Sequence, residues 1–354
     1  MALTLTSLPQ IAAFDFDAVI DVRSPSEFAE DHLPGAINLP VLDDAERARV
    51  GTIYKQQSPF LARKVGAALV AKNAARHLEG PLADLPGSWR PLVYCWRGGQ
   101  RSGSFASILS QVGWRVDLVQ GGYKAWRKLV VEEVQEAPVR APVVVLDGNT
   151  GSAKTEILSG LAARGLQTID LEGLANHRGS LFGGMPGGQP AQKAFEGRLA
   201  MQLAALDPSR PVVIEAESSR VGDLSVPKQL WAAMGAAPRL RLAVPATARA
   251  AYLARAYADM TVDAARLGAV IEQLRPVHAA EVIESWHGMA EGGRFEALAA
   301  DLMIRHYDPR YEKHRARFAR DTDVEIAAES LAPGALDGIV ARVADAVAAL
   351  SGRG

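Results

Sequence analysis

The sequence predicts an α/β protein made of two domains in tandem, each built on a parallel sheet. The chain has 354 residues and is 48% hydrophobic, which is more than one typical core would hold. In both halves short apolar runs alternate with helical patterns, an order that is typical of parallel sheets. Residues 132–142 are charged and contain two prolines, so they predict a linker. We therefore expect one domain over residues 1–131 and a second over residues 143–354.

The first domain is predicted to begin with a buried strand at residues 18–23, followed by a helix. Ser24 can cap that helix, Pro25 suits its first position, and Glu27 can return the hydrogen bond of the cap. Further strands are predicted within residues 32–40, 91–95 and 116–119, and helices within residues 61–77, 103–112 and 121–129.

The second domain is predicted to open with a buried strand at residues 143–147 and a glycine-containing loop. A helix follows over residues 154–163, and Gly165 ends it. The alanine-rich residues 246–299 predict a mainly helical region. Two more strands are predicted at residues 212–215 and 240–244, and an amphipathic helix at residues 334–350.

The composition excludes several classes of protein. The formal net charge is −1, so the chain as a whole does not attract nucleic acid, and any RNA contact must come from a local patch. The single cysteine, Cys95, excludes an intrachain disulfide and a zinc site made of cysteines. The N-terminal residues lack the basic and apolar regions of a signal peptide, and no apolar run predicts a membrane helix. We expect a cytoplasmic enzyme without a membrane partner.

Cys95 is followed by a polar loop, and residues 95–102 read CWRGGQRS. A thiol at the end of a strand, before a turn that opens a helix, lies where backbone N–H groups and the helix N-terminus favour negative charge. Arg97 and Arg101 add positive charge, so we expect the pKa of Cys95 to be lowered. The predicted catalytic residues are Cys95, Arg97 and Arg101, and the loop that surrounds the sulfur is completed by Gly98, Gly99, Gln100 and Ser102.

Two other interpretations of the cysteine remain. Cys95 could be an inert core residue at the end of a hydrophobic strand, although its polar neighbours suit a core poorly. Cys95, Arg101 and the serine that follows also have the spacing of cysteine-dependent phosphatases, in which the arginine binds the phosphate. A phosphatase would need a general acid as well, and the sequence does not identify one. The loop alone therefore does not decide between a phosphatase and a sulfur or selenium transferase.

The segments around the loop favour the transferase. Residues 19–40, 95–102 and 118–129 resemble the rhodanese superfamily in their order and spacing, over most of residues 1–130. Rhodaneses carry sulfur as a cysteine persulfide, and the resemblance assigns that role to Cys95. It also implies that the first domain is a rhodanese-like parallel-sheet domain.

The second domain carries a candidate phosphate-binding loop at residues 147–155, which read DGNTGSAKT. Gly148, Lys154 and Thr155 match the P-loop pattern, while Ala153 replaces its second glycine, and a methyl group there can alter the approach of the backbone to a phosphate. Thr155 could bind Mg²⁺. The alternative is an ordinary strand–turn–helix junction. The predicted phosphate-binding residues are Gly148, Gly151, Ser152, Lys154 and Thr155.

Three further features could belong to a site in the second domain. Glu215 and Glu217 follow a predicted strand and could supply a metal-linked carboxylate, or they could be a surface acidic pair. His177 and Arg178 open a polar, glycine-rich loop that suits phosphate or RNA, or that is simply a flexible surface loop.

The third feature is the basic segment at residues 305–320, where aromatic residues interleave with positive charges. Six Lys and Arg residues stand there against two acidic ones. Such a segment suits single-stranded RNA, or it is a solvated helix face. Its basic residues are Arg305, Arg310, Lys313, Arg315, Arg317 and Arg320.

Over nearly its full length the chain resembles the tRNA 2-selenouridine synthases. The resemblance rests on residues 50–70, 95–102, 177–184, 189–196, 214–222 and 306–311. Residues 50–70 are the most telling, because ordinary rhodaneses lack this segment. The expected fold is a rhodanese-like domain followed by a P-loop-containing α/β domain with a helical C-terminal region.

The resemblance implies a selenium-transferring enzyme that is also a tRNA geranyltransferase. Its partner would be tRNA with 2-thiouridine at the wobble position, and its substrates geranyl diphosphate and selenophosphate, with no tightly bound cofactor. S-geranyl-2-thiouridine would form first, and selenium carried on Cys95 as a selenopersulfide would then replace the geranylated sulfur. The P-loop domain would hold the diphosphate or help to seat the tRNA, and an enzyme that makes selenophosphate could be a partner.

The residues themselves leave two other functions open. One is a generic persulfide sulfurtransferase joined to a nucleotide-dependent kinase or ATPase. The other is a non-catalytic RNA-binding or regulatory protein with a degenerate rhodanese domain, against which the intact Cys95 argues.

Overall fold

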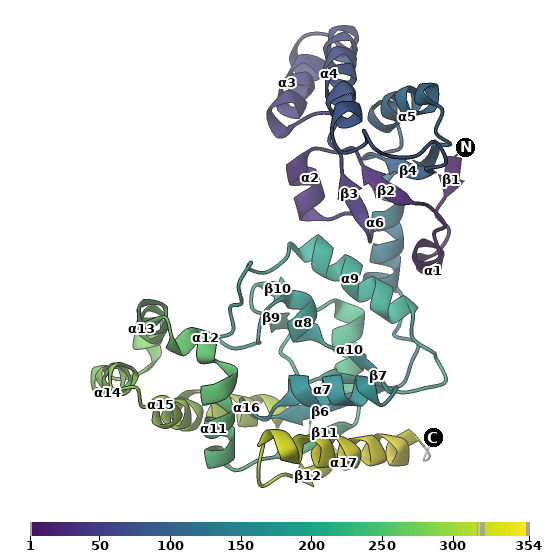
Figure 1. Cartoon of the computed structure of the whole chain (residues 1–354). Helices are drawn as coiled ribbons and strands as arrows, with labels where there is room; N and C mark the ends of the chain where they lie inside the picture. Colours follow the sequence, from purple (N-terminus) through teal and green to yellow (C-terminus); the bar gives the residue numbers. More distant parts are fainter. Residues whose placement is uncertain (1, 317, 319–322, 352–354) are drawn as a thin grey trace. The chain divides into compact units, whose positions relative to one another are not determined.

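The computed structural model describes residues 2–316, 318 and 323–351. The chain divides into two compact units (Figure 1), one of residues 1–137 with 190–205 and the other of residues 138–189 with 206–354. Each unit contains a five-stranded sheet in which all neighbouring strands are parallel. The predicted α/β class is therefore confirmed.

The sheet of the first unit has the strand order β1-β5-β4-β2-β3. Its strands are β1 (Ala2–Thr4), β2 (Ala18–Asp21), β3 (Ala36–Asn38), β4 (Pro91–Tyr94) and β5 (Asp117–Gln120). The central strand, β4, is buried along its whole length, as its apolar sequence predicts. Cys95 follows this strand directly, so it lies at the carboxyl edge of the sheet, where open α/β sheets bind their ligands.

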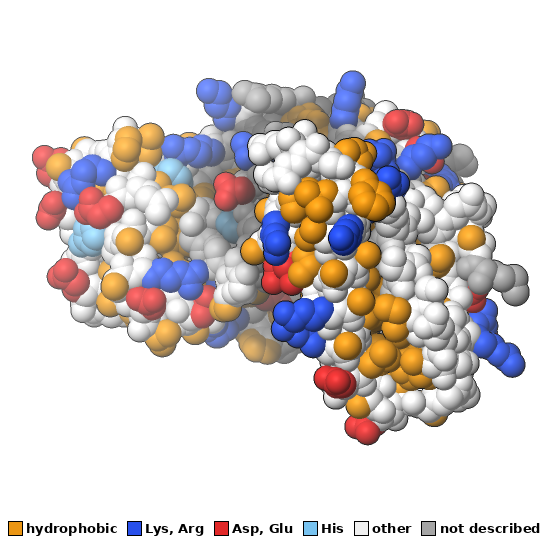
Figure 2. Space-filling model, turned by 90° about the horizontal axis from the view of Figure 1, so that it is seen from above, with side chains coloured by type: hydrophobic (Ala, Val, Ile, Leu, Met, Phe, Trp, Pro, Cys, Tyr) orange, Lys and Arg blue, Asp and Glu red, His pale blue; other side chains and the backbone are white. Residues whose placement is uncertain are grey.

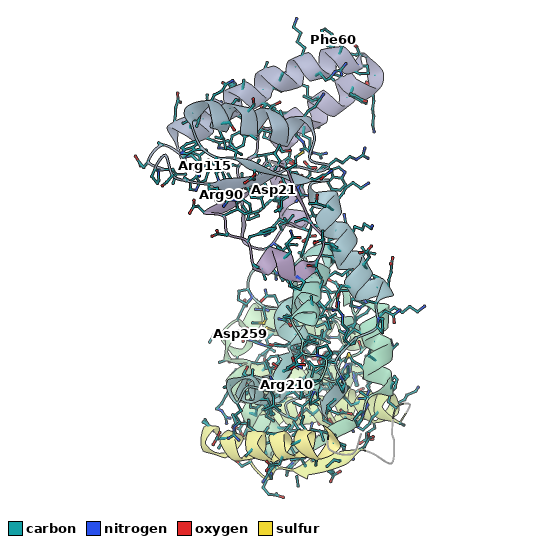
Figure 3. The ribbon with its side chains drawn as sticks, turned by 90° about the vertical axis from the view of Figure 1, so that its right-hand side faces the viewer. Asp21, Phe60, Arg90, Arg115, Arg210 and Asp259 are labelled. Atoms are coloured by element: carbon teal, nitrogen blue, oxygen red, sulfur yellow. The ribbon has the colours of Figure 1, made fainter. Side chains whose placement is uncertain are left out.

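Two long helices of the first unit, α3 (Asp44–Gln56) and α4 (Pro59–Glu79), form a hairpin. The sequence predicted α4 but not α3, because α3 buries no side chain and so has no apolar stripe to reveal it. Figure 2 looks down on this end of the first unit, where hydrophobic and basic side chains are interspersed. Phe60 projects from the end of the hairpin and is 71% exposed (Figure 3).

The remaining helices of the first unit connect or flank the strands. They are α1 (Leu8–Ala12), α2 (Pro25–Glu30), α5 (Gln100–Val112) and α6 (Tyr123–Val131), with one π-helical segment at Glu132–Glu136. That segment continues α6 where the sequence predicted the start of a linker.

Helix α9 (Gln192–Ala204) also belongs to the first unit, which differs from the division predicted from the sequence. It packs against α6 and buries Phe195 and Leu199. Glu196 forms an ion pair with Arg127, and Gly197 lies so close to Trp126 that an added Cβ would be 3.1 Å from its ring. Such long-range contacts leave no mark in the local sequence pattern.

The sheet of the second unit has the order β12-β11-β6-β8-β7. Its strands are β6 (Val143–Gly148), β7 (Gln167–Ile169), β8 (Val212–Glu215), β11 (Arg239–Ala243) and β12 (Val324–Ala327). The candidate phosphate loop leaves the central strand, β6, and leads into α7 (Lys154–Ala163). Helix α7 and the C-terminal helix α17 (Pro333–Ser351) pack against this sheet around one apolar core.

The predicted helical region lies beside this sheet in Figure 1 and has a core of its own around Ile283 and Trp286. Its helices are α11 (Ala246–Ala256), α12 (Ala258–Thr261), α13 (Ala264–Glu272), α14 (Ala280–Glu291), α15 (Phe295–Leu302) and, after a π-helical segment at Met303–Tyr307, α16 (Asp308–Arg315). The unit also contains α8 (Leu171–Ala175), α10 (Lys228–Ala236) and a hairpin of β9 (Arg220–Val221) and β10 (Leu224–Ser225). Among the helices described, none has both the length and the apolar character that crossing a membrane requires.

Candidate functional site

The first candidate site is centred on Cys95, whose thiol is free and 4% exposed. The Ser102 hydroxyl donates a hydrogen bond to Sγ over 3.2 Å, and the backbone N–H groups of Ser102 and Gly99 also point to the sulfur. Burial alone would raise the pKa of Cys95, but these hydrogen bonds and the charge of Arg101 outweigh it and lower the pKa below its ordinary value. The loop therefore favours the thiolate, the form that acts as a nucleophile.

The shape of the loop depends on the segment that follows β5. Gly98 has a φ of +66°, and an added Cβ would lie 2.6 Å from the Val119 carbonyl oxygen, so only glycine fits there. The backbone N–H of Tyr123 donates to the Cys95 carbonyl over 2.8 Å, and that of Lys124 donates to the Trp96 carbonyl over 3.1 Å. These contacts explain why the cysteine loop and residues 118–129 occur together in the sequence.

Arg101 is held in place by α2. Its guanidinium donates to both carboxylate oxygens of Glu27, over 2.7 and 3.3 Å, and Glu27 also accepts a hydrogen bond from the Ser24 backbone, as the predicted helix cap requires. Burial raises the pKa of Glu27, but Arg101 lowers it by more, so the net shift is downward. Arg97, in contrast, is exposed and forms no ion pair with any described residue. It is the arginine that can meet an incoming anion.

A cleft of about 1100 Å³ lies beside the cysteine loop within the first unit. The side of the loop that faces the cleft is formed by Trp96, Gln100, Arg101 and Ser104, and the α3–α4 hairpin supplies much of the remaining wall. The hairpin adds basic residues to that wall, namely Arg47, Lys55 and Arg63. Residues 50–70 thus help to line a cleft that is large enough for a nucleotide and whose wall has more basic than acidic residues.

The second candidate site is the phosphate loop at the end of β6. Ala153 adopts a left-handed conformation, with φ of +57° and ψ of +33°, so the loop retains a turn that suits glycine at this position. Lys154 is only 8% exposed, and its Nζ donates to the Gly148 carbonyl over 3.3 Å. Burial lowers the pKa of Lys154, but its electrostatic interactions with Tyr311, Glu172 and Glu217 raise it by more. The raised pKa favours the charged form of the lysine.

Carboxylates lie close to this lysine and to Thr155. Thr155 donates a hydrogen bond to Glu172 over 3.2 Å, and the backbone N–H of Glu172 donates to Glu215 over 2.8 Å. Glu215 and Glu217 are buried rather than on the surface, and burial raises the pKa of both well above the ordinary value. One oxygen of each has no hydrogen-bond partner among the described residues.

The structure gives no further support to a metal site. Within the described ranges, no group of three or more His, Cys, Asp or Glu side chains is arranged to hold a metal ion. The Thr155 hydroxyl already donates a hydrogen bond to Glu172, a residue that the sequence did not identify as part of the site. Binding of Mg²⁺ at Thr155 therefore stays a prediction.

The loop that begins at His177 and Arg178 lines the same pocket as the phosphate loop, a space of about 440 Å³. Arg178 forms an ion pair with Asp259 at 2.9 Å, and its guanidinium lies 4.6 Å from the centre of the Tyr257 ring. Nδ1 of His177 accepts a hydrogen bond from the Gly179 backbone, and burial lowers the pKa of this histidine. The fold thus brings the phosphate loop and the loop that begins at His177 to one pocket, and hydrogen bonds and ion pairs hold both in place.

The described basic residues of the segment at 305–320 lie in different surroundings. Arg305 forms an ion pair with Asp301, and Arg310 forms hydrogen bonds to His306. Lys313 is exposed. Arg317 and Arg320 lie outside the described residues.

The end of α16 instead turns toward the phosphate loop. Arg315 donates to Asp147 over 3.2 Å and to Asn149 over 2.7 Å. Asp308, at the start of the helix, accepts from Arg249 over 2.7 Å and from Asn149 over 3.0 Å. Residues 306–311 and α16 therefore brace the loop from outside, a role that sequence reasoning missed.

Comparison with known proteins matches both units. A family model described as the tRNA 2-selenouridine synthase AAA domain matches residues 141–273, and one described as a rhodanese-like domain matches residues 9–129. A tRNA 2-selenouridine synthase of Chromohalobacter salexigens is 35% identical over 336 residues, which are 86% of this chain and 91% of that protein. One of Aeromonas salmonicida is 38% identical over 258 residues, 72% of this chain and 68% of that protein.

Among solved structures, the chain is similar to the N-terminal domain of a protein from Clostridium difficile 630 that is described as ATP/GTP binding. The identity is 34% and the TM-score 0.33, over 37% of this chain and all of that one.

Proposed function

This chain belongs to the tRNA 2-selenouridine synthase family, and we propose that its two units carry out two successive reactions on one tRNA base. As in the family, the enzyme transfers selenium in tRNA modification. The proposal adds the division of labour: the P-loop unit alkylates the base and the cysteine unit introduces selenium. We expect the base to be the wobble 2-thiouridine and the reaction to take place in the cytoplasm.

The first reaction transfers a geranyl group from geranyl diphosphate to the sulfur of 2-thiouridine. The departing diphosphate carries negative charge, which cations and backbone N–H donors stabilise most when they are already in position. Lys154 supplies the cation, and the amides of the loop from Gly148 to Thr155 supply the donors. Alkylation converts the poorly leaving thiocarbonyl sulfur into a thiolate leaving group.

In the second reaction the Cys95 thiolate attacks the selenium of selenophosphate, the Se–P bond breaks and phosphite leaves, so selenium is held on Cys95. This selenium then attacks the base carbon, the bond to the geranylated sulfur breaks and geranylthiolate leaves. A small-molecule thiol finally reduces the remaining S–Se bond and frees Cys95.

The lowered pKa of Cys95 keeps the sulfur ready to receive selenium, and the exposed Arg97 can attract the phosphate group. Because the chain has no second cysteine, no resolving thiol can displace the selenium by forming an intrachain disulfide. An enzyme that makes selenophosphate would supply this step.

One observation carries the proposal. The only thiol of the chain lies in a loop that lowers its pKa, and the same chain presents a charged lysine on a phosphate loop. A generic sulfurtransferase would have no use for the second site together with the basic cleft of the α3–α4 hairpin.

The test supplies the protein with 2-thiouridine-containing tRNA, geranyl diphosphate and selenophosphate and identifies the nucleosides by mass spectrometry. We expect Cys95→Ala to abolish selenium incorporation while S-geranyl-2-thiouridine still accumulates. We expect Lys154→Ala to lower geranylation by roughly 100-fold, the scale of one lost charge-stabilising donor. Lys228→Ala, at an exposed lysine of α10, serves as the control. Normal selenium incorporation without Cys95, or normal geranylation without Lys154, would refute the corresponding assignment.

A further inference from the structure

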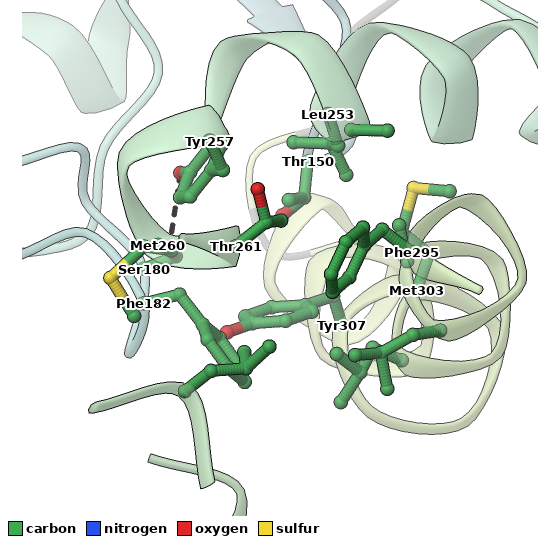
Figure 4. A pocket seen from close by; sticks show the side chains of 15 residues that line it. Thr150, Ser180, Phe182, Leu253, Tyr257, Met260, Thr261, Phe295, Met303 and Tyr307 are labelled. Atoms are coloured by element: carbon green, nitrogen blue, oxygen red, sulfur yellow. Dashed lines mark hydrogen bonds between the residues drawn. The ribbon is translucent and has the colours of Figure 1, made fainter. Parts of the chain in front are cut away.

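A second, apolar pocket of about 80 Å³ lies in the P-loop unit (Figure 4). Its walls come from α11, α12, α15, the π-helical segment before α16 and the loop after Arg178. Side chains that line it include Phe182, Leu253, Met260, Phe295 and Met303. Almost all of the surface that faces the pocket is carbon or sulfur, so the pocket suits a hydrocarbon and would hold a charged or polar group poorly.

The apolar pocket adjoins the pocket of the phosphate loop. Thr150, Ser180, Leu253 and Tyr257 line both spaces. Ser180 and Tyr257 share a hydrogen bond of 3.3 Å at this boundary, drawn as a dashed line in Figure 4. Thr150 is itself part of the phosphate loop, so a ligand that reaches both spaces passes the loop directly.

Two buried hydroxyl groups lie at this place. The Thr150 hydroxyl interacts with the Tyr311 side chain, and the Tyr307 hydroxyl interacts with Ser180. Thr150 lies where the apolar pocket meets the phosphate pocket, which is where the oxygen that joins a phosphate to a carbon chain would lie.

We propose that this pocket binds the branched hydrocarbon tail of a prenyl diphosphate whose diphosphate lies on the phosphate loop. The inference rests on the proposed function and adds to it the place of the tail. A nucleotide would fit poorly, because its base and ribose would find few hydrogen-bond partners in the apolar space. One water molecule needs roughly 10–15 Å³ of such space, so this pocket has room for several. The pocket therefore matches a short tail better than a long one.

Binding measured by calorimetry on the full chain tests the proposal, with inorganic diphosphate and geranyl diphosphate as ligands. We expect geranyl diphosphate to bind at least ~10-fold more tightly, because the tail leaves water for an apolar pocket. Ala299→Phe fills the pocket from α15 and should remove most of this difference while leaving the affinity for inorganic diphosphate unchanged. Ala297→Phe, exposed on the same helix and outside the pocket, is the matched control.

A second variant keeps the test decisive if Ala299→Phe does not fold. Phe295→Ala enlarges the pocket and should increase the affinity for the longer farnesyl diphosphate relative to geranyl diphosphate. Equal affinities of the wild-type protein for both first ligands, each dependent on Lys154, would overturn the tail pocket and leave the phosphate loop intact. Binding of neither ligand, or binding that Lys154→Ala does not weaken, would instead overturn the proposed function of the loop.

Discussion

Ser102 is the residue whose contact with Cys95 is most easily tested. Its hydroxyl hydrogen bond lowers the pKa of the thiol, so we expect Ser102→Ala to raise that pKa. At a fixed pH below the pKa, a rise of one pKa unit leaves about tenfold less thiolate. The ultraviolet absorbance of the thiolate measures this titration directly, because Cys95 is the only cysteine. Ser104→Ala, exposed on the same helix, should leave the titration curve in place.

Glu215 links the site of the P-loop unit to stability. Burial raises the pKa of Glu215. The unfolded state loses this proton near the ordinary glutamate pKa of about 4.3, whereas the folded state keeps it to higher pH. Stability therefore falls as the pH rises from that value toward the raised pKa of the folded state. We expect Glu215→Gln, which keeps an acceptor for the Glu172 N–H, to stabilise the protein at pH values above the raised pKa and to have little effect in acid.

Urea unfolding across this pH range measures the difference. The exposed Glu296→Gln is the control and should shift stability little at any pH. A Glu215→Gln variant with the same pH dependence as the wild type would contradict the expected titration.

Ala153 is where the phosphate loop departs from its motif, and the structure shows a local cost. A left-handed conformation costs an alanine about 1 kcal/mol relative to glycine. We expect Ala153→Gly to increase the free energy of unfolding by about 0.5 kcal/mol, because part of the gain is lost to the greater freedom of glycine in the unfolded chain. Ala232→Gly, exposed within α10, should destabilise by about 1 kcal/mol in the same denaturation experiment.

Besides Arg315, helix α16 braces the phosphate loop through the ion pair of Asp308 with the buried Arg249. Asp308 accepts hydrogen bonds from the buried Arg249, which also donates to the Thr150 carbonyl of the loop. We expect Asp308→Ala to destabilise by about 3 kcal/mol, because it leaves a buried arginine without its counter-charge. Glu325→Ala breaks an exposed pair with Arg241 and should cost less than about 1 kcal/mol. Equal losses in the two variants would show that α16 does not brace the loop.

Elements with a strong local pattern were the ones that the sequence could predict. The predicted helix at residues 154–163 and strand at residues 212–215 match α7 and β8 residue for residue. The edge strands β1 and β7 were missed because each has only three residues, too few to show an alternation. Helix α9 was missed because its burial depends on the first unit, about 60 residues earlier in the chain.

The same contrast between local patterns and long-range contacts applies to the residues of each candidate site. The cysteine loop and the phosphate loop are short continuous motifs, so their residues could be named from the sequence. The residues that form hydrogen bonds with these loops could not be named from the sequence. Glu27 and Arg101 are 74 positions apart, and Asn149 and Asp308 are 159 apart. Distances of that kind are set by the order of strands in each sheet, which a single sequence does not encode in any local pattern.

The division of the whole chain predicts how fragments behave. A fragment of residues 1–142 lacks α9, so Trp126 loses its contact with Gly197 and Arg127 loses Glu196. We expect this fragment to unfold at lower urea concentration than one in which a glycine-rich linker appends residues 190–205. Lys193→Ala in the longer fragment removes only an ion pair with the partly exposed Glu30 and should change its stability little. Identical midpoints of the two fragments would refute the need for α9.

Helix α9 also has a consequence for synthesis on the ribosome. The first unit receives its last helix only after residues 138–189 of the second have been made. During synthesis, the surface of the first unit against which α9 packs therefore stays exposed to solvent until residues 138–189 of the second unit have been translated. Completion of the two units is interleaved in time, so slowing translation before residue 190 would prolong the exposure of an unfinished core.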